Sequence, residues 1–188
     1  VVIGNVPWAS HRILVNNYNG GKKAIEHLLE LGHERIGCIT GSLDIYAYRD
    51  KVQGYRAALA ERGIPVDSAL LVEEPAEGKQ GGYLAMKRLM ELPQPPTAIF
   101  CADFEMTMGG WLYLSEEGID VPADLSLVSY CSGDLGQLAE IPLTTIRIGT
   151  QYWACRSTSA PGYSRRPDLG PHGYLHLNGA SARQVNES

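Results

Sequence analysis

Residues 96–131 read PTAIFCADFEMTMGGWLYLSEEGIDVPADLSLVSYC, and this pattern is typical of a β-α-β unit. The apolar run Ala98–Cys101 is too short for a helix, so it predicts a buried strand. Residues 106–117 carry apolar side chains at helical spacing, and Gly118 ends that helix. Residues 125–130 form a second apolar run and predict another strand. Two buried strands joined by one helix make a parallel pair with a right-handed crossover.

The same alternation extends toward both ends of the chain. Apolar runs predict strands at 1–3, 35–40, 70–72 and 143–148, and helical spacing predicts helices at about 20–31, 47–62 and 81–91. Polar side chains at 16–19 are expected to cap the first helix. The order of elements predicts an α/β fold, a doubly wound parallel sheet.

Three regions are expected along the chain: a strand and crossover at 1–14, a ligand-binding lobe at 15–148, and a tail at 149–188. Residues 150–188 contain 12 Gly, Pro or Ser among 39 residues and no lysine. They carry 4 basic and 2 acidic residues, against 12 and 19 in residues 1–149. Such a segment buries too little apolar surface to offset its ordering entropy, so an irregular or disordered tail is expected.

The composition excludes several classes of function. With 44% hydrophobic and 20% charged residues among 188, the chain is typical of a globular protein. Its net charge of −5 argues against a nucleic-acid-binding surface of its own. The sequence contains no apolar run that approaches the roughly 18 residues of a membrane span. Its four cysteines form no CxxC pair. We therefore expect neither a zinc site nor a disulfide framework, and we expect a reducing cytoplasm as its location.

Candidate ligand-binding residues follow the predicted strands, because ligands of such sheets sit beyond the carboxyl ends of the strands. They are Asn5, Ser42, Ala102, Asp103 and Cys131. Asp103 could act as a general base or cap the helix beginning near Glu105, and we favour the cap. For Arg49, two interpretations are equally compatible with the sequence. Its guanidinium could bind hydroxyls or a carboxylate at the cleft, or it could lie on a solvated helix surface.

Other polar features have structural interpretations. His33 is expected to be a satisfied structural residue, and residues 73–77 (EEPAE) a solvated acidic loop. No phosphate loop, GxGxxG, HExxH or GxSxG motif occurs. We therefore predict no catalytic residue, no metal and no cofactor, and interpret the chain as a non-enzyme.

Several segments together resemble the effector-binding core of the lactose/galactose repressor (LacI/GalR) family of transcription regulators. The order and gaps agree across about 1–148. The matching segments are Gly20-Gly21 with 24–33 (AIEHLLELGH), 35–41 (RIGCITG), Arg49 with Gly54-Tyr55, 96–100 (PTAIF), 118–128 (GIDVPADLSLV) and 141–146 (IPLTTI).

The resemblance implies one lobe of a two-lobed, periplasmic-binding-protein-like type I fold with a small effector between the lobes. Arg49 matches the family arginine that contacts the effector, and Asp103 matches the aspartate of an Asn-Asp pair. Ala102 stands in place of the asparagine, and Cys131 in place of an aspartate after the next strand. The loop ending in Glu77 lacks an aromatic residue often found there. These departures predict weakened sugar binding or an effector that is not a simple sugar.

We accordingly expect the effector-binding core of a LacI-type DNA-binding regulator, with a sugar or related small molecule as its partner. The intact parent is expected to be a homodimer that contacts operator DNA through a helix-turn-helix headpiece absent from this chain, with no role for a membrane. Two alternatives remain: a periplasmic sugar-binding transport protein of the same fold, and a truncated, non-functional remnant of a regulator.

Overall fold

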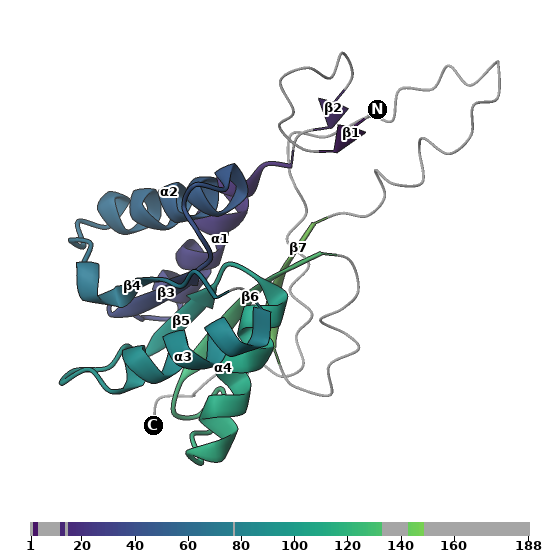
Figure 1. Ribbon diagram of the computed structural model, residues 1–188. Helices are drawn as coiled ribbons and strands as arrows, with labels where there is room; N and C mark the ends of the chain where they lie inside the picture. The colour runs from purple at the N-terminus through teal and green to yellow at the C-terminus, as the bar shows by residue number, and fades with distance from the viewer. Residues whose placement is uncertain (1, 4–11, 14, 77, 133–142, 149–188) are drawn as a thin grey trace.

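A five-stranded parallel sheet with helices on both faces forms the body of the molecule (Figure 1). The computed structural model describes residues 2–3, 12–13, 15–76, 78–132 and 143–148. The strands are β3 (Ile36–Thr40), β4 (Leu71–Glu73), β5 (Ala98–Cys101), β6 (Ser126–Ser132) and β7 (Thr144–Ile148), in the spatial order β4-β3-β5-β6-β7. The doubly wound α/β prediction is confirmed. Two short strands, β1 (Val2–Ile3) and β2 (Arg12–Ile13), pair separately in parallel.

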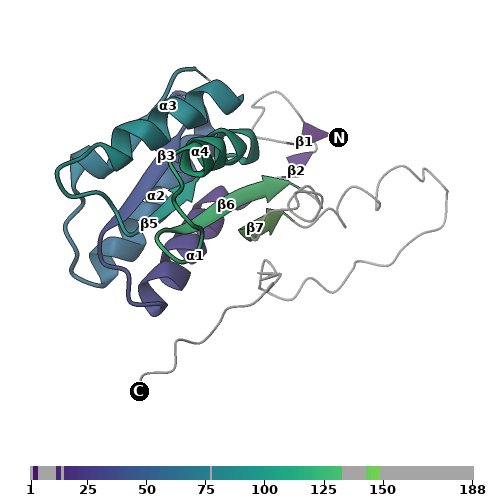
Figure 2. The same ribbon diagram turned by 90° about the horizontal axis from the view of Figure 1, so that it is seen from below.

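Two helices cover each face of the sheet, as Figure 2 shows from a second direction. One layer contains α1 (Asn17–Glu30) and α2 (Tyr46–Glu61), and the other α3 (Gly78–Met90) and α4 (Phe104–Glu116). A 3₁₀ turn, η1 (Ser68–Leu70), precedes β4. The expected helices are all present, although α1, α3 and α4 begin two or three residues earlier than the sequence indicated. Glycine at positive φ follows α4 at Gly118, as predicted, and α1 at Gly32.

The core consists of two apolar clusters, one on each face. Alternation along the strands sends Cys38, Phe100 and Val128 toward α1 and α2, whereas Ile39, Ile99 and Leu127 pack against α3 and α4. The largest side chains buried with them include Ile25, Leu28, Tyr55, Met86, Leu89 and Leu114. Cys38 and Cys101 are core residues, since both are fully buried.

Each helix pair crosses at very short distance, and glycine makes this possible on both faces. A Cβ at Gly21 would lie 2.2 Å from the Lys51 carbonyl oxygen, and one at Gly54 2.2 Å from the Tyr18 carbonyl oxygen. On the opposite face, a Cβ at Gly82 would lie 1.9 Å from the Met106 carbonyl oxygen. These contacts are with backbone atoms, so any larger residue would push the helices apart.

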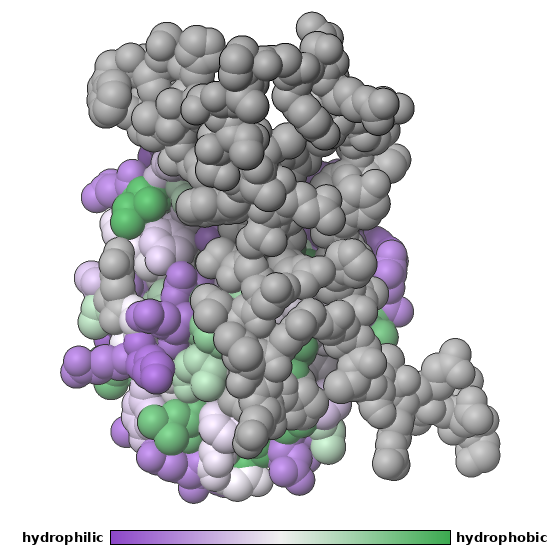
Figure 3. Space-filling model, turned by 90° about the vertical axis from the view of Figure 1, so that its right-hand side faces the viewer, coloured by the Kyte–Doolittle hydropathy of each residue, from purple (hydrophilic) through white to green (hydrophobic). Residues whose placement is uncertain are grey.

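Figure 3 shows one side of the surface. On the described residues visible there, hydrophilic and hydrophobic side chains are interspersed. Within the described ranges, no helix is long and apolar enough to cross a membrane. The predicted tail at 149–188 lies outside the described residues.

Candidate functional site

The carboxyl ends of the sheet strands meet at one edge, and backbone hydrogen bonds join the loops that leave it. The Ala102 amide donates to the Ile39 carbonyl at 2.8 Å, and the Glu74 amide donates to the Thr40 carbonyl at 2.9 Å. The Leu43 amide donates to Glu73 Oε1 at 2.8 Å. The loop before α2 and the ends of β3, β4 and β5 are therefore held together at the edge where ligands of parallel sheets bind.

A buried lysine lies at this edge. Lys51 is on α2, and its side chain is only 6% exposed. Its Nζ donates a 2.7 Å hydrogen bond to the Ala102 carbonyl oxygen. The same Nζ lies 4.0 Å from the centre of the Tyr130 ring and 5.0 Å from that of Tyr48. Both distances are within the range of cation–π attraction. We call Lys51, Tyr48, Tyr130, Ala102 and Asp103 the lysine cluster.

The electrostatics of the lysine cluster are dominated by burial. Desolvation lowers the pKa of Lys51 from 10.5 to about 8, although the negative charge of Asp103 opposes that change. Burial also raises the pKa of Tyr130, so its phenol stays neutral. Lys51 is therefore predominantly a cation at neutral pH, in a site where a charged amine is costly.

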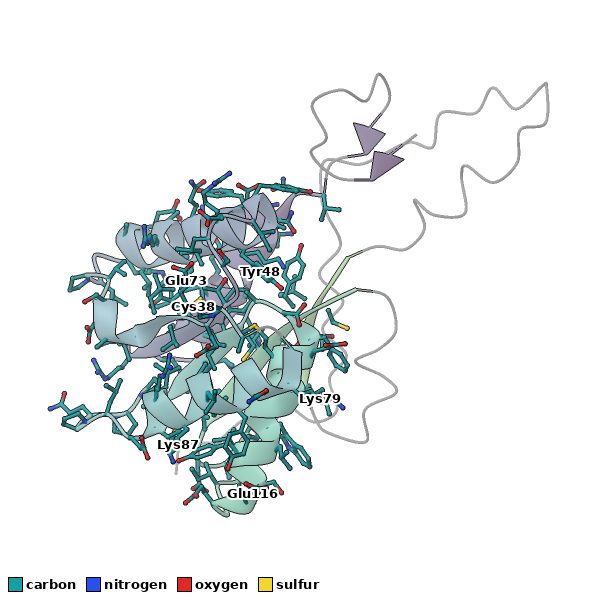
Figure 4. All side chains as sticks on the ribbon, viewed as in Figure 1. Cys38, Tyr48, Glu73, Lys79, Lys87 and Glu116 are labelled. Carbon is teal, nitrogen blue, oxygen red and sulfur yellow. The ribbon has the colours of Figure 1, made fainter. Side chains whose placement is uncertain are left out.

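The first turns of α1 hold the lysine cluster in place. Tyr130 donates a 3.0 Å buried hydrogen bond to Asn17 Oδ1, which fixes the direction of the ring. Gly20 leaves room for that ring, since a Cβ there would lie 2.5 Å from Tyr130 Cε2. Gly21 packs directly on the backbone of Lys51. Figure 4 shows Tyr48 on the side of the α1–α2 layer that faces the sheet, whereas Lys87 and Glu116 belong to the α3–α4 layer.

Asp103 caps α4, as the sequence favoured. Its Oδ1 accepts the amides of Glu105 at 2.9 Å and Met106 at 3.3 Å. Below it, the Thr107 hydroxyl donates to the Asp103 carbonyl at 2.7 Å. Because that hydroxyl has a single proton, Ser129 must be the donor in its 2.7 Å bond to Thr107 Oγ1. Asp103 therefore contributes a carboxylate that is already ordered by its helix.

The other predicted site residues have different positions. Ala102 reaches the site through its carbonyl group, which a prediction based on side chains could not anticipate. Ser42 is half-buried, and its Oγ accepts the Asp44 amide at 3.3 Å. Arg49 is exposed, and its side chain makes no ion pair within the described part of the chain. Cys131 is buried at the end of β6, and Asn5 lies outside the described residues.

The sequence interpretation missed Lys51, although a signal was present. Helical spacing places Lys51 beside Val52, Tyr55 and Tyr48 on the face of α2 that turns inward, and a lysine there needs a reason. A second expectation was wrong. Glu74 is not part of a solvated loop but is buried, and its Oε2 lies 2.9 Å from Arg88 Nη1 in an ion pair without hydrogen-bond alignment.

His33 is a structural residue, as expected. Its Nδ1 lies 3.0 Å from Thr97 Oγ1 and its Nε2 2.9 Å from Ser126 Oγ, so it joins the residues that precede β5 to the start of β6. Burial, with a smaller effect from His27, lowers the pKa of His33. This places His33 at the amino ends of the strands, away from the lysine cluster. Among the residues the structure describes, no group of three or more His, Cys, Asp or Glu could hold a metal ion.

Comparison with known proteins gives a consistent result. Residues 25–154 match the family described as periplasmic binding protein-like domain. The HTH-type transcriptional repressor CytR of Escherichia coli (strain K12) is 38% identical over 135 residues, which are 70% of this chain and 38% of that protein. The HTH-type transcriptional repressor PurR of Actinobacillus pleuropneumoniae serotype 3 (strain JL03) is 36% identical over 137 residues, 73% of this chain and 40% of that protein.

Solved structures show the same relationship. A LacI transcriptional regulator from Bacillus cereus subsp. cytotoxis NVH 391-98 superposes with a TM-score of 0.66 at 31% identity, covering 74% of this chain and 51% of that one. A LacI family regulator from Mycobacterium smegmatis gives a TM-score of 0.67 at 29% identity, covering 75% and 52%. The chain thus spans about half of these structures and less than half of the curated relatives it matches.

Proposed function

Because the chain belongs to the family of periplasmic binding protein-like domains, and its relatives are LacI-family repressors, we propose that it binds the small effector of a LacI-type transcription regulator. The observation that carries the proposal is the lysine cluster, which collects a cation, two aromatic faces and a carboxylate at the edge of the sheet. Few, well-placed polar groups beside aromatic surface are typical of small-molecule sites. Fold alone would not distinguish a regulator from a transport protein, but the named relatives are repressors.

The proposed contacts to the effector come from the lysine cluster and from the other predicted site residues. Lys51 Nζ and the Asp103 carboxylate supply a donor and an acceptor, and the Tyr48 and Tyr130 rings supply stacking surface. Arg49, Ser42 and Cys131, together with Asn5, which lies outside the described residues, are proposed as further contacts. In the intact regulator, which we place in the cytoplasm as a homodimer, effector binding would change the spacing of DNA-binding segments outside this chain.

The test is thermal unfolding of the purified chain with a panel of sugars, sugar phosphates, nucleosides and nucleobases. A ligand selective for the folded state raises the melting temperature by mass action. We expect one ligand class to raise it, and Lys51→Met to remove the increase while unfolding stays cooperative. Arg49→Ala tests the predicted arginine contact, and Lys87→Met, exposed in the last turn of α3 at the opposite end of the strands, is the matched control. Cooperative unfolding that no ligand shifts would contradict the proposal.

A further inference from the structure

Lys51 is a buried cation without a paired anion. No carboxylate of the described residues lies within 4.0 Å of its Nζ, which has one carbonyl and two aromatic rings as neighbours. A buried charge without a partner is strongly unfavourable, and proteins normally pair such charges. Among the described residues, Lys51 Nζ therefore has no anionic partner at contact distance, and Asp103 acts on it only from farther away.

The groups facing Lys51 do not supply the missing charge. Tyr48 from α2 and Tyr130 from β6 present ring faces, and burial raises the pKa of the Cys38 thiol from β3, which keeps it protonated. From the start of α4, Asp103 is the one described carboxylate whose charge is felt by Lys51, and its Oδ1 is held by two amides of α4. The N-terminus of α2 adds positive potential, because no side chain caps it and the first turn of the helix contains no acidic residue.

We propose that the effector carries an anionic oxygen group, a carboxylate or a phosphate, that pairs with Lys51 Nζ. This inference rests on the proposed function and names the ligand class of the same site. An ammonium group has three N–H donors, and Lys51 uses one on the Ala102 carbonyl. The other donors have only ring faces within the described cluster, and an anionic oxygen is a much stronger acceptor than a ring. A neutral polyol would leave the buried charge unpaired.

The test compares ligands that differ in one charged group. The full chain is titrated by calorimetry with ribose and ribose 5-phosphate, glucose and gluconate, and adenosine and adenosine monophosphate. We expect an anionic member to bind at least about tenfold more tightly than its neutral counterpart, since charge-assisted bonds are about twice as strong as neutral ones. The phosphate and carboxylate pairs separate the two sources of charge.

Three variants make the role of Lys51 specific. Affinity of the wild-type chain for the anionic ligand should fall about tenfold from pH 7 to pH 9, because the amine loses its proton near pH 8. Lys51→Arg should bind without this pH dependence because arginine remains charged, and Lys51→Met should lose the preference for the anion. Lys87→Met, at the opposite end of α3, should behave as wild type. Equal binding of neutral and anionic members would overturn this inference and leave the proposed function intact. No binding by any ligand to a cooperatively folded chain would contradict both.

Discussion

The Tyr130 hydroxyl and Asn17 Oδ1, 113 positions apart in the chain, share a buried hydrogen bond of 3.0 Å. It connects the end of β6 with the first residue of α1. The ring it orients lies against the Lys51 ammonium group on its other side. This bond therefore links the packing of α1 on the sheet to the position of one ring of the candidate site.

Removing this hydroxyl should destabilise the fold. Tyr130→Phe keeps the ring but leaves the Asn17 acceptor buried without its partner, so we expect a loss of about 1–3 kcal/mol in the free energy of unfolding, measured with urea. Tyr83→Phe is the control, because its 2.7 Å bond to Glu116 is exposed. It should change stability by less than about 0.5 kcal/mol. Equal losses would show that the Tyr130 bond contributes no more than a surface bond.

At the glycine crossing of α1 and α2, substitution of glycine by alanine should lower the stability of the fold instead of raising it. Within a helix, Gly→Ala normally stabilises by about 0.5–1 kcal/mol. Gly21→Ala and Gly54→Ala should instead destabilise by about 2 kcal/mol or more, because the added Cβ would meet backbone atoms of the partner helix. Gln53→Ala, exposed beside Gly54, should be nearly neutral. Chemical denaturation measures all three, and a stabilising Gly21→Ala would refute the close crossing.

The buried Lys51 charge should make stability rise with pH. Its folded pKa of about 8 is below the unfolded value of 10.5, so the folded state releases its proton first. The wild-type chain should therefore gain about 1 kcal/mol between pH 7 and pH 9 from this group. Lys51→Met should be more stable than wild type at pH 7 by about 1–3 kcal/mol and lack this gain. If the two chains show the same pH dependence, Lys51 is not the buried charge described.

The lowered pKa of His33 predicts that the free energy of unfolding falls in the acid pH range. Its folded pKa is below the ordinary 6.5, so the stability it provides is complete above pH 6.5 and is lost as the pH falls through the folded value. His33→Gln should flatten the fall in unfolding free energy between pH 7 and pH 5, measured by urea titration at each pH. A variant that leaves the slope unchanged would place the titrating group elsewhere.

Local chemistry accounts for what could be predicted from the sequence. Asn16 caps α1 by accepting the Asn19 amide at 3.0 Å, and Asp103 caps α4, because each acts within three residues of itself. The strands and helices could also be predicted, because the spacing of apolar residues is likewise a local feature of the sequence. These elements needed no knowledge of distant partners.

Contacts between distant segments account for what was missed. Lys51 meets the Ala102 carbonyl from 51 positions away, and the burial of Glu74 depends on Arg88 from the following helix. A run of acidic residues is equally compatible with solvent and with such a partner. The backbone carbonyl of Ala102 also carries no mark in the sequence, since every residue has one.

The paired glycine crossings on both faces of the sheet have a mechanical consequence. Where the backbones of two helices are in van der Waals contact, no flexible side chains lie between them that could rearrange to allow sliding. Sliding of α1 past α2, or of α3 past α4, would require the two backbones to separate first. We therefore expect each helix pair to resist internal shear and to move as one unit.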